Sequence, residues 1–361
     1  GDFAFIEWET LKDVVLPDSI TSIGEFAFCG CGFSNFTIPD TVTDIREGAF
    51  YSSQLTDVTI PGSIKNIELA TFFSCSQLEC VTIENGVSHI DKFAFDGCDS
   101  LQSLEIPDSV TSIGVHAFAG SALQSVEISD SVTSIGALAF GSTTLTGYAV
   151  DENNNYFSSD NGILYNKDKT TLENYPAGKE DTFFCVPDSV TNIAMSAFYG
   201  CVSLEIVTIP ESVEVIGYSA FKFCDALESI SILNPECMFV ENIDDEALAE
   251  EGAPIIPETA VIYGYENSTA QAYAEKYGNT FIAIDGEDTS EDINVSDKEN
   301  SGVQFDFAEN TFDKSHGKVS VEIKKDVTQS QYLLSDFSKV TAWNITFYNE
   351  AGEEIQPGAP V

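Results

Sequence analysis

The segment Ile106-Pro107-Asp108-Ser109-Val110-Thr111-Ser112-Ile113-Gly114 decides the fold, because relatives of it recur along the 361-residue chain. Successive copies are 22 or 23 residues apart, except for one step of 58 residues. Repeats of this length indicate a solenoid, in which each unit buries its apolar side chains against the next unit. The residues equivalent to Pro107 are Pro17, Pro39, Pro61, Glu84, Ser129, Pro187 and Pro210.

Two further anchors keep the same period. One is a small residue followed by Phe, as in Ala94-Phe95, and three residues later comes a second, which is Cys98 in this copy. A strand-like hexamer follows, with apolar residues at its first, fourth and sixth positions, as in Leu101 to Ile106. Strand pairing between such units sets a stacking rise of about 4.8 Å. The Phe anchors are Phe5, Phe28, Phe50, Phe72, Phe95, Phe118, Phe140, Phe198 and Phe221, and the Cys anchors are Cys31, Cys75, Cys98, Cys201 and Cys224.

These three anchors together resemble the BspA-type leucine-rich repeats of bacterial surface proteins. The resemblance covers residues 1 to about 284. It implies a β-rich leucine-rich-repeat solenoid of about nine repeats, on a bacterial protein that is secreted or displayed at the cell surface. Since Ala4-Phe5 is already the second anchor, we expect the chain to begin inside a repeat.

Two breaks interrupt the repeat. The first, at about 150–182, has the alternating pattern of a β-hairpin, which we expect to project from the solenoid. The second, at about 234–284, contains a helical pattern at Ser268 to Gly278 and a final strand at Phe281 to Ile284. This second segment resembles the C-terminal cap of the same family.

The remaining chain differs in composition. Residues 285–300 are polar and acidic, which predicts a flexible linker. Residues 301–361 alternate like strands, and the run from Trp343 to Pro357 is similar to Ig-like modules of Gram-positive surface proteins. We therefore expect a small all-β Ig-like sandwich there, truncated after its last strand.

The charge limits the partners. The chain has 59 acidic and 15 basic residues, a net charge of −44, so phosphates of nucleic acids and anionic membrane surfaces repel it. No stretch approaches the roughly 20 apolar residues of a membrane-spanning helix. We expect a monomer that binds no nucleic acid and does not insert into a membrane.

Candidate catalytic and metal-binding groups are sparse. The three histidines are His89, His116 and His316, and the first two occupy variable repeat positions that favour exposed solenoid residues over a site. The in-phase cysteines favour buried free thiols, with disulfides between neighbouring turns as the alternative. Acidic residues of the linker favour a solvated segment over weak calcium binding. We predict no enzyme activity, no metal and no cofactor.

The third and fifth positions of each predicted strand point away from the core and form a small, polar, mildly acidic face. Either this face binds a ligand weakly or it is only a solvated sheet. Aromatic residues around the insertion form a second group, which either meets a sugar or protein or packs the hairpin onto the solenoid. The candidate ligand residues are Asp13, Asn35, Asp57, Thr59, Thr82, Glu105, Glu127, Tyr156, Tyr165 and Tyr175.

Three functions fit this organisation. The leading hypothesis is a non-enzymatic adhesion module that binds an extracellular protein or glycan. The alternatives are a structural spacer that displays other domains of a larger surface protein, and an accessory region of a secreted hydrolase.

Overall fold

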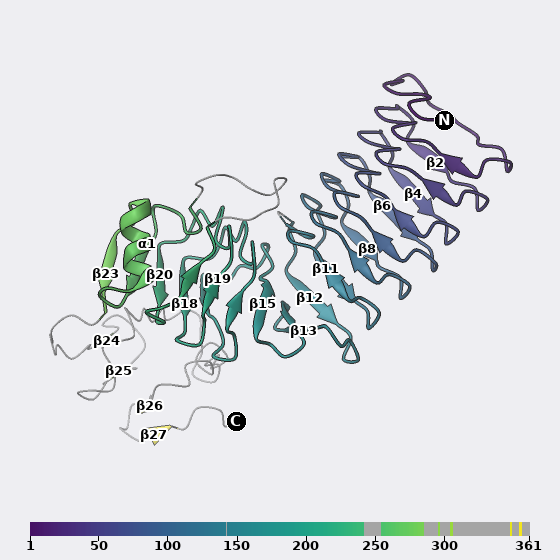
Figure 1. The fold of residues 1–361 in the computed structure, drawn as a ribbon. Helices are drawn as coiled ribbons and strands as arrows, with labels where there is room; N and C mark the ends of the chain where they lie inside the picture. Colours follow the sequence, from purple (N-terminus) through teal and green to yellow (C-terminus); the bar gives the residue numbers. More distant parts are fainter. Residues whose placement is uncertain are drawn as a thin grey trace.

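The computed structural model describes residues 1–141, 143–241 and 254–284, together with four two-residue strands, Val295–Ser296 (β24), Gln304–Phe305 (β25), Phe347–Tyr348 (β26) and Glu354–Ile355 (β27). The described residues up to residue 284 form a β-solenoid of about eleven turns. Figure 1 shows the turns as a row of stacked coils, with the N-terminus at one end and helix α1 near the other. The repeat therefore gives the predicted fold, with about two more turns than the sequence pattern indicates.

Each turn of the N-terminal stack contributes one long and one short strand, and equivalent strands pair in parallel with those of the next turn. The long strands follow the Cys anchor, and the short strands lie in the Val-Thr-Ser-Ile segment. The long strands are β2 (Asn35–Thr37), β4 (Asp57–Ile60), β6 (Cys80–Ile83), β8 (Ser103–Glu105), β10 (Ser125–Ile128) and β12 (Gly147–Val150). The short strands are β1 (Ser22–Ile23), β3 (Asp44–Ile45), β5 (Asn66–Ile67), β7 (His89–Ile90), β9 (Ser112–Ile113) and β11 (Ser134–Ile135).

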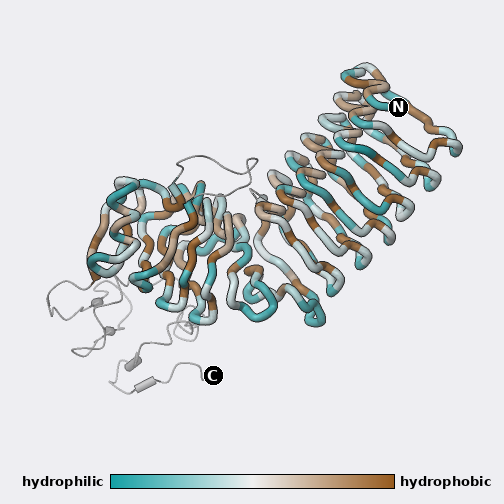
Figure 2. The backbone as a smooth tube through the Cα atoms, viewed as in Figure 1, coloured by the Kyte–Doolittle hydropathy of each residue, from teal (hydrophilic) through white to brown (hydrophobic). Residues whose placement is uncertain are grey.

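A column of Phe rings runs through the core between the two strand ladders. Consecutive rings from Phe50 to Phe140 stack face to face, with centroids 5.1–5.4 Å apart and interplanar angles of 3–7°. Because each ring covers its neighbours, the column excludes water along the stack. Figure 2 shows the same periodicity as hydrophobic segments that recur from coil to coil.

The corner before each Phe anchor is built by a residue in the left-handed region. Phe26, Phe93 and His116 adopt φ of 47°, 58° and 56°, a backbone conformation that residues other than glycine rarely adopt. The backbone of this corner is fixed by bonds to the next turn, such as Phe93 N–H to Val115 O at 3.0 Å. Repetition of these bonds compensates the local strain in every turn.

The insertion forms three antiparallel strands, β13 (Phe157–Asp160), β14 (Ile163–Asn166) and β15 (Thr171–Asn174). The predicted hairpin is present, but it does not simply project. Strand β15 pairs in parallel with the next short strand of the solenoid, and Leu164 and Tyr165 are buried. The insertion is thus built into the stack.

The C-terminal stack repeats the same two ladders. Tyr175 occupies the Phe column, with its ring 5.3 Å from that of Phe198, and Phe221 donates its N–H to Ile255 O as earlier anchors do to the next turn. These two turns lack the Phe anchor, so the sequence pattern does not count them. The long strands are β16 (Phe183–Cys185), β18 (Ile206–Ile209), β20 (Ser229–Ile232), β22 (Val261–Gly264) and β23 (Phe281–Ala283), and the short strands are β17 (Asn192–Ile193), β19 (Val215–Ile216) and β21 (Met238–Phe239).

Helix α1 (Thr269–Tyr277) lies at the C-terminal end of the described solenoid. Ser268 caps its N-terminus by accepting a hydrogen bond from Gln271 N–H, and Gly278 ends it with φ of 85°. Tyr273 packs inward and its hydroxyl accepts the N–H groups of Ile255 and Ile256. The helix and β23 agree with the elements predicted for this segment.

Beyond residue 284 the structure describes two antiparallel strand pairs, β24 with β25 and β26 with β27. Strand β24 lies within the predicted linker. The rest of the predicted linker at 285–300 and of the predicted Ig-like module at 301–361 lies outside the described residues, as does His316.

Candidate binding surface

The outward side of the N-terminal long-strand ladder carries two rows of side chains, which we call the strand face. Residues of β4 and β6 alternate between exposed and buried, so every second side chain points away from the core. Parallel register then places equivalent residues side by side. The first row is Asn35, Asp57, Cys80, Ser103 and Ser125, and the second is Thr37, Thr59, Thr82, Glu105 and Glu127.

The strand face is polar and made of short side chains. Its hydroxyl and carboxylate groups are exposed, and Thr56 Oγ1 donates to Asp57 Oδ2 at 2.6 Å at the border of the first row. Such a surface can donate and accept hydrogen bonds over several turns, but the two rows contain no aromatic or Arg anchor of the kind that dominates tight interfaces. Its chemistry fits a polar ligand held by many weak contacts.

The remaining predicted ligand residues lie elsewhere. Asp13 is exposed but precedes the first long strand of the ladder, and Tyr156 is 53% exposed at the start of the insertion. Tyr165 and Tyr175, the candidate ligand residues of the insertion, are only 2% and 1% exposed, which corrects their place on a ligand surface and favours the alternative of packing. Tyr175 packs in the ring column and donates its hydroxyl to Asp181 Oδ2 at 2.7 Å. Packing of the insertion therefore explains both rings.

The equivalent rows of the C-terminal stack have a different chemistry. The first row there is Phe183, Ile206, Ser229 and Val261, so three of its four side chains are apolar, and Phe183 is 46% exposed. The sequence interpretation missed Phe183 because no Phe or Cys anchor precedes this strand, where Tyr175 and Gly178 occupy the two anchor positions. The run Phe183 to Cys185, which directly precedes Val186-Pro187, is the pattern that identifies this strand.

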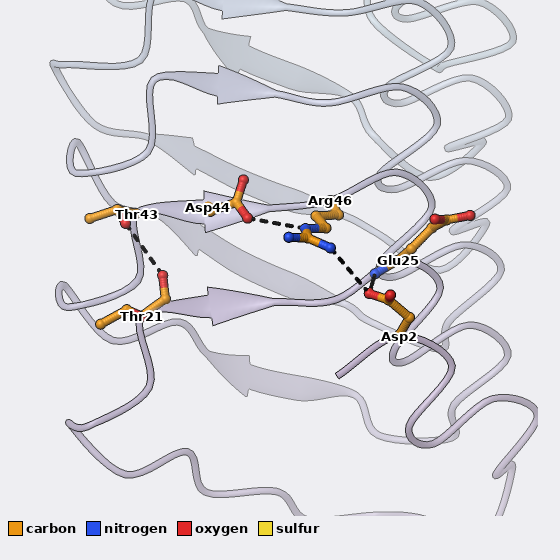
Figure 3. A network of polar contacts seen from close by, with 6 residues as sticks. All are labelled: Asp2, Thr21, Glu25, Thr43, Asp44 and Arg46. Carbon is orange, nitrogen blue, oxygen red and sulfur yellow. Dashed lines mark hydrogen bonds and ion pairs between the residues drawn. The ribbon is translucent and has the colours of Figure 1, made fainter.

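The single arginine lies at the N-terminal turns, on the other ladder. Arg46 Nε is 3.3 Å from Asp44 Oδ2, and Arg46 Nη1 is 3.6 Å from Asp2 Oδ1. Figure 3 shows this network, in which Asp2 also accepts the backbone N–H of Glu25. Because these pairs are about half exposed, they add little to stability, but they occupy the guanidinium group.

The family follows from the comparison of this repeat with known ones. The family model described as the BspA type leucine rich repeat region, in six copies, matches residues 1–120, 73–172 and 179–252, which is more than half of the chain. The chain belongs to this family. No curated protein matches its sequence.

The BspA-type chain is also similar to solved structures. A leucine rich cell surface protein from Faecalibacterium prausnitzii shares 27% identity with a TM-score of 0.52, and the match covers 74% of this chain and 84% of that one. A leucine-rich repeat protein from Eubacterium ventriosum shares 27% identity with a TM-score of 0.46, and the match covers 53% of this chain and 60% of that one. A leucine-rich repeat protein from Bacteroides ovatus shares 22% identity with a TM-score of 0.46, over 78% and 80% of the two chains.

The BspA-type turns place His116 in a half-buried position, not the exposed one that its variable place in the repeat indicates. Its ring stacks on Phe93 at 5.2 Å, and its Nδ1 is 3.6 Å from Asp96 Oδ2. Attraction at this distance favours the charged forms, but burial is the larger effect. Burial, with repulsion from Asp99, raises the pKa of Asp96 to about 6, and burial lowers the pKa of His116. His89 is exposed, as predicted.

None of the nine cysteines, which all lie within the described residues, forms a disulfide bond. Those in the repeat phase donate to the carbonyl of a Phe-column residue in the preceding turn, as Cys98 Sγ does to Phe72 O at 3.3 Å. Burial raises the pKa of Cys75 to about 11 and holds that of Cys98 well above its usual value. Thiolates are the reactive form of cysteine, so these groups fit packing better than chemistry.

Within the part of the chain that the structure describes, no group of three or more His, Cys, Asp and Glu side chains is placed to hold a metal ion. None of the helices described there is long and apolar enough to cross a bilayer.

Proposed function

We propose that this BspA-type array is a non-enzymatic binding module at a bacterial cell surface, and that its strand face contacts an extracellular protein or glycan. The supporting observation is the strand face itself, two registered rows of exposed hydroxyl and carboxylate groups that repeat over several turns. A surface location agrees with the Faecalibacterium structure, which is that of a cell surface protein. In the same proposal, residues 285–300 link the solenoid to an Ig-like module at 301–361.

The test is binding of the purified chain to arrays of extracellular matrix proteins and glycans. We expect retention of a polar ligand, and we expect Thr82→Arg, in the middle of the second row, to abolish that retention by steric and electrostatic obstruction. Asn66→Arg is the matched control, because Asn66 is an exposed strand residue on the short-strand ladder. Failure of the folded protein to bind any component, or equal loss with both variants, contradicts the proposal.

A structural spacer is the second candidate, favoured by the absence of aromatic and Arg anchors from the two rows of the strand face. If the chain is only a spacer, Thr82→Arg leaves every interaction of the cell surface unchanged. Shortening the stack by whole turns then reduces the function of the domain that it displays.

A further inference from the structure

A cavity of about 210 Å³, partly open to solvent, lies where the insertion interrupts the stack. One wall is residues 135–140, which run from the end of β11 to the Phe column. The opposite wall contains Glu173 and Asn174 of β15 and the following corner at Ala194 and Met195. Tyr148, Phe157 and Leu164 complete the lining, in which polar and apolar groups share the surface about equally.

The cavity exists because one turn is missing from the backbone ladder. In the preceding turn, His116 N–H bonds to Ala137 O and Phe118 N–H bonds to Ala139 O, at 3.2 and 2.7 Å. Among the described residues, the N–H groups of Leu138 and Phe140 donate no equivalent backbone hydrogen bond to a following turn. Likewise Ile113 O accepts Gly136 N–H at 2.8 Å, whereas Ile135 O has no equivalent donor in the described chain. The wall therefore carries unpaired backbone groups.

Glu173 occupies a register position where neighbouring turns have little space. Leu172 pairs with Ile193, and Ile193 with Ile216, so Glu173 is equivalent to Ala194 and Gly217. A Cβ atom added to Gly217 would lie 2.5 Å from the backbone of the preceding turn. A Glu side chain fits at this position because the neighbour of β15 on that side is β14 of the insertion and not a solenoid turn, and Glu173 falls at the irregularity in their pairing. Glu173 lines the cavity.

The Glu173 carboxylate has no cation in the described chain. The lysines of the insertion are engaged elsewhere: Lys167 with Glu152 O, Lys169 with Asp160, and Lys179 with Asp181. Burial raises the pKa of Glu173, with no opposing charge to lower it. An unpaired, half-buried carboxylate lowers the stability of the fold, because its charge is partly desolvated without a partner. It therefore marks a place where a cation would bind favourably.

We propose that this cavity binds a primary ammonium group carried on a short apolar body. The ammonium group bonds to Glu173 and to the free carbonyl of Ile135, and the apolar body packs against Leu138, Phe140 and Tyr148. An anion would be repelled by Glu173, and a neutral apolar ligand would desolvate the carboxylate further without pairing it. The volume is below the roughly 300–1,000 Å³ of pockets for drug-sized ligands, which limits the occupant to a small amine or a single lysine side chain.

Nuclear magnetic resonance titration of the full chain tests the proposal and separates these two sources. The probes are n-pentylamine, N-acetyl-lysine methylamide and the neutral 1-pentanol. We expect saturable shifts at Ala137, Leu138 and Ala194 with n-pentylamine, and much weaker binding of 1-pentanol. Binding of the lysine derivative as well identifies a partner's side chain as an occupant, whereas binding of n-pentylamine alone identifies a free amine.

Glu173→Gln is expected to weaken n-pentylamine binding by at least about tenfold, because it removes a charge-assisted hydrogen bond. Thermal unfolding is expected to show that this variant is no less stable than the natural chain, since it removes an unpaired carboxylate. Glu180→Gln, an exposed residue of the same insertion, is the matched control and should bind normally. Equal binding of 1-pentanol and n-pentylamine, unchanged binding by the Glu173 variant, or no saturable shift with any probe overturns the proposal.

Discussion

The uninterrupted N-terminal stack and the interruption at the insertion contain the same kinds of residues, but their rings pack differently in the two regions. Within the stack, Phe95 lies between two parallel rings at 5.1 and 5.3 Å. At the interruption, Phe140 has one stacked neighbour and meets Tyr148 edge-on, at an interplanar angle of 73°. In the stack each turn satisfies the polar groups of the previous one. Unpaired groups, and with them a candidate ligand chemistry, occur where this repetition stops.

The ring column gives the largest test of this comparison. Phe95→Ala is expected to lower the free energy of unfolding by about 3–5 kcal/mol, because it leaves a void between two rings that the stack holds apart. Phe140→Ala should cost about 1 kcal/mol less, since one side of that ring already borders a cavity. Guanidinium unfolding of both variants checks this, and equal losses would show that the interruption is packed as well as the stack.

Asn154 is the second test, because it anchors the insertion to the stack. Its Nδ2 donates to Ser129 O and Val132 O at 2.7 and 2.9 Å, and its Oδ1 accepts the N–H groups of Tyr156 and Phe157. Asn154→Ala is expected to cost about 2–4 kcal/mol, since it leaves several buried groups unpaired.

The neighbouring Asn153 provides the control for this loss. It is exposed and bonds only to Asp151, so Asn153→Ala should change the unfolding free energy by less than about 1 kcal/mol. The role assigned to Asn154 is contradicted if the two variants are equally stable by chemical denaturation.

Asp96 tests whether a carboxylate inside the stack is also destabilised in its charged form. The pKa of an aspartate in the unfolded chain is about 4, whereas that of Asp96 in the folded protein is about 6. The stability that comes from protonated Asp96 is therefore fully present below about pH 4 and is lost as the pH rises through 6. Asp96→Asn is therefore expected to stabilise the protein by about 1–2 kcal/mol at pH 8 and to have no effect at pH 3.5. Unfolding curves at both pH values decide this, and a destabilised variant at pH 8 would show that the contact with His116 outweighs burial.

The smallest effect is expected at the Cys anchor. Ser53 and Thr143 occupy this position in other turns, and Thr143 Oγ1 donates to a Phe-column carbonyl, that of Phe140. Cys98→Ser should therefore cost less than about 1 kcal/mol by thermal unfolding. A cost above 2 kcal/mol would mean that the sulfur atom contributes packing that an oxygen atom cannot replace.

Much of the fold could be predicted, because a stacked repeat imposes the same burial on the same position of every turn. The Phe anchors and the strand rows follow from that constraint, whereas the C-terminal helix follows from the separate helical pattern at Ser268 to Gly278. Tyr175 escaped it because Asn174-Tyr175 lacks the small residue and the Phe of the anchor, and Asp181 satisfies its hydroxyl group inside the structure. Its turn, and the one that Ile255 completes, were therefore not counted.

Less of the candidate sites than of the fold could be predicted from the sequence. The strand rows could be predicted from alternation alone. Glu173 could not, because within Thr171 to Asn174 it reads as an ordinary polar strand residue. Its isolation depends on the irregular pairing of β14 with β15 and on lysines that bond elsewhere, which are properties of the folded chain.

The interior thiols have a consequence for where this protein can fold. Each in-phase Cys acts as a hydrogen-bond donor to the turn before it, as Cys75 does to Phe50 O and Cys224 to Phe198 O. No covalent crosslink joins the described turns, and the raised pKa values keep the buried sulfur atoms protonated and slow to oxidise. The contacts between the described turns thus need no oxidising surroundings, and the solenoid is expected to fold under reducing conditions, where a protein that depends on disulfides would not.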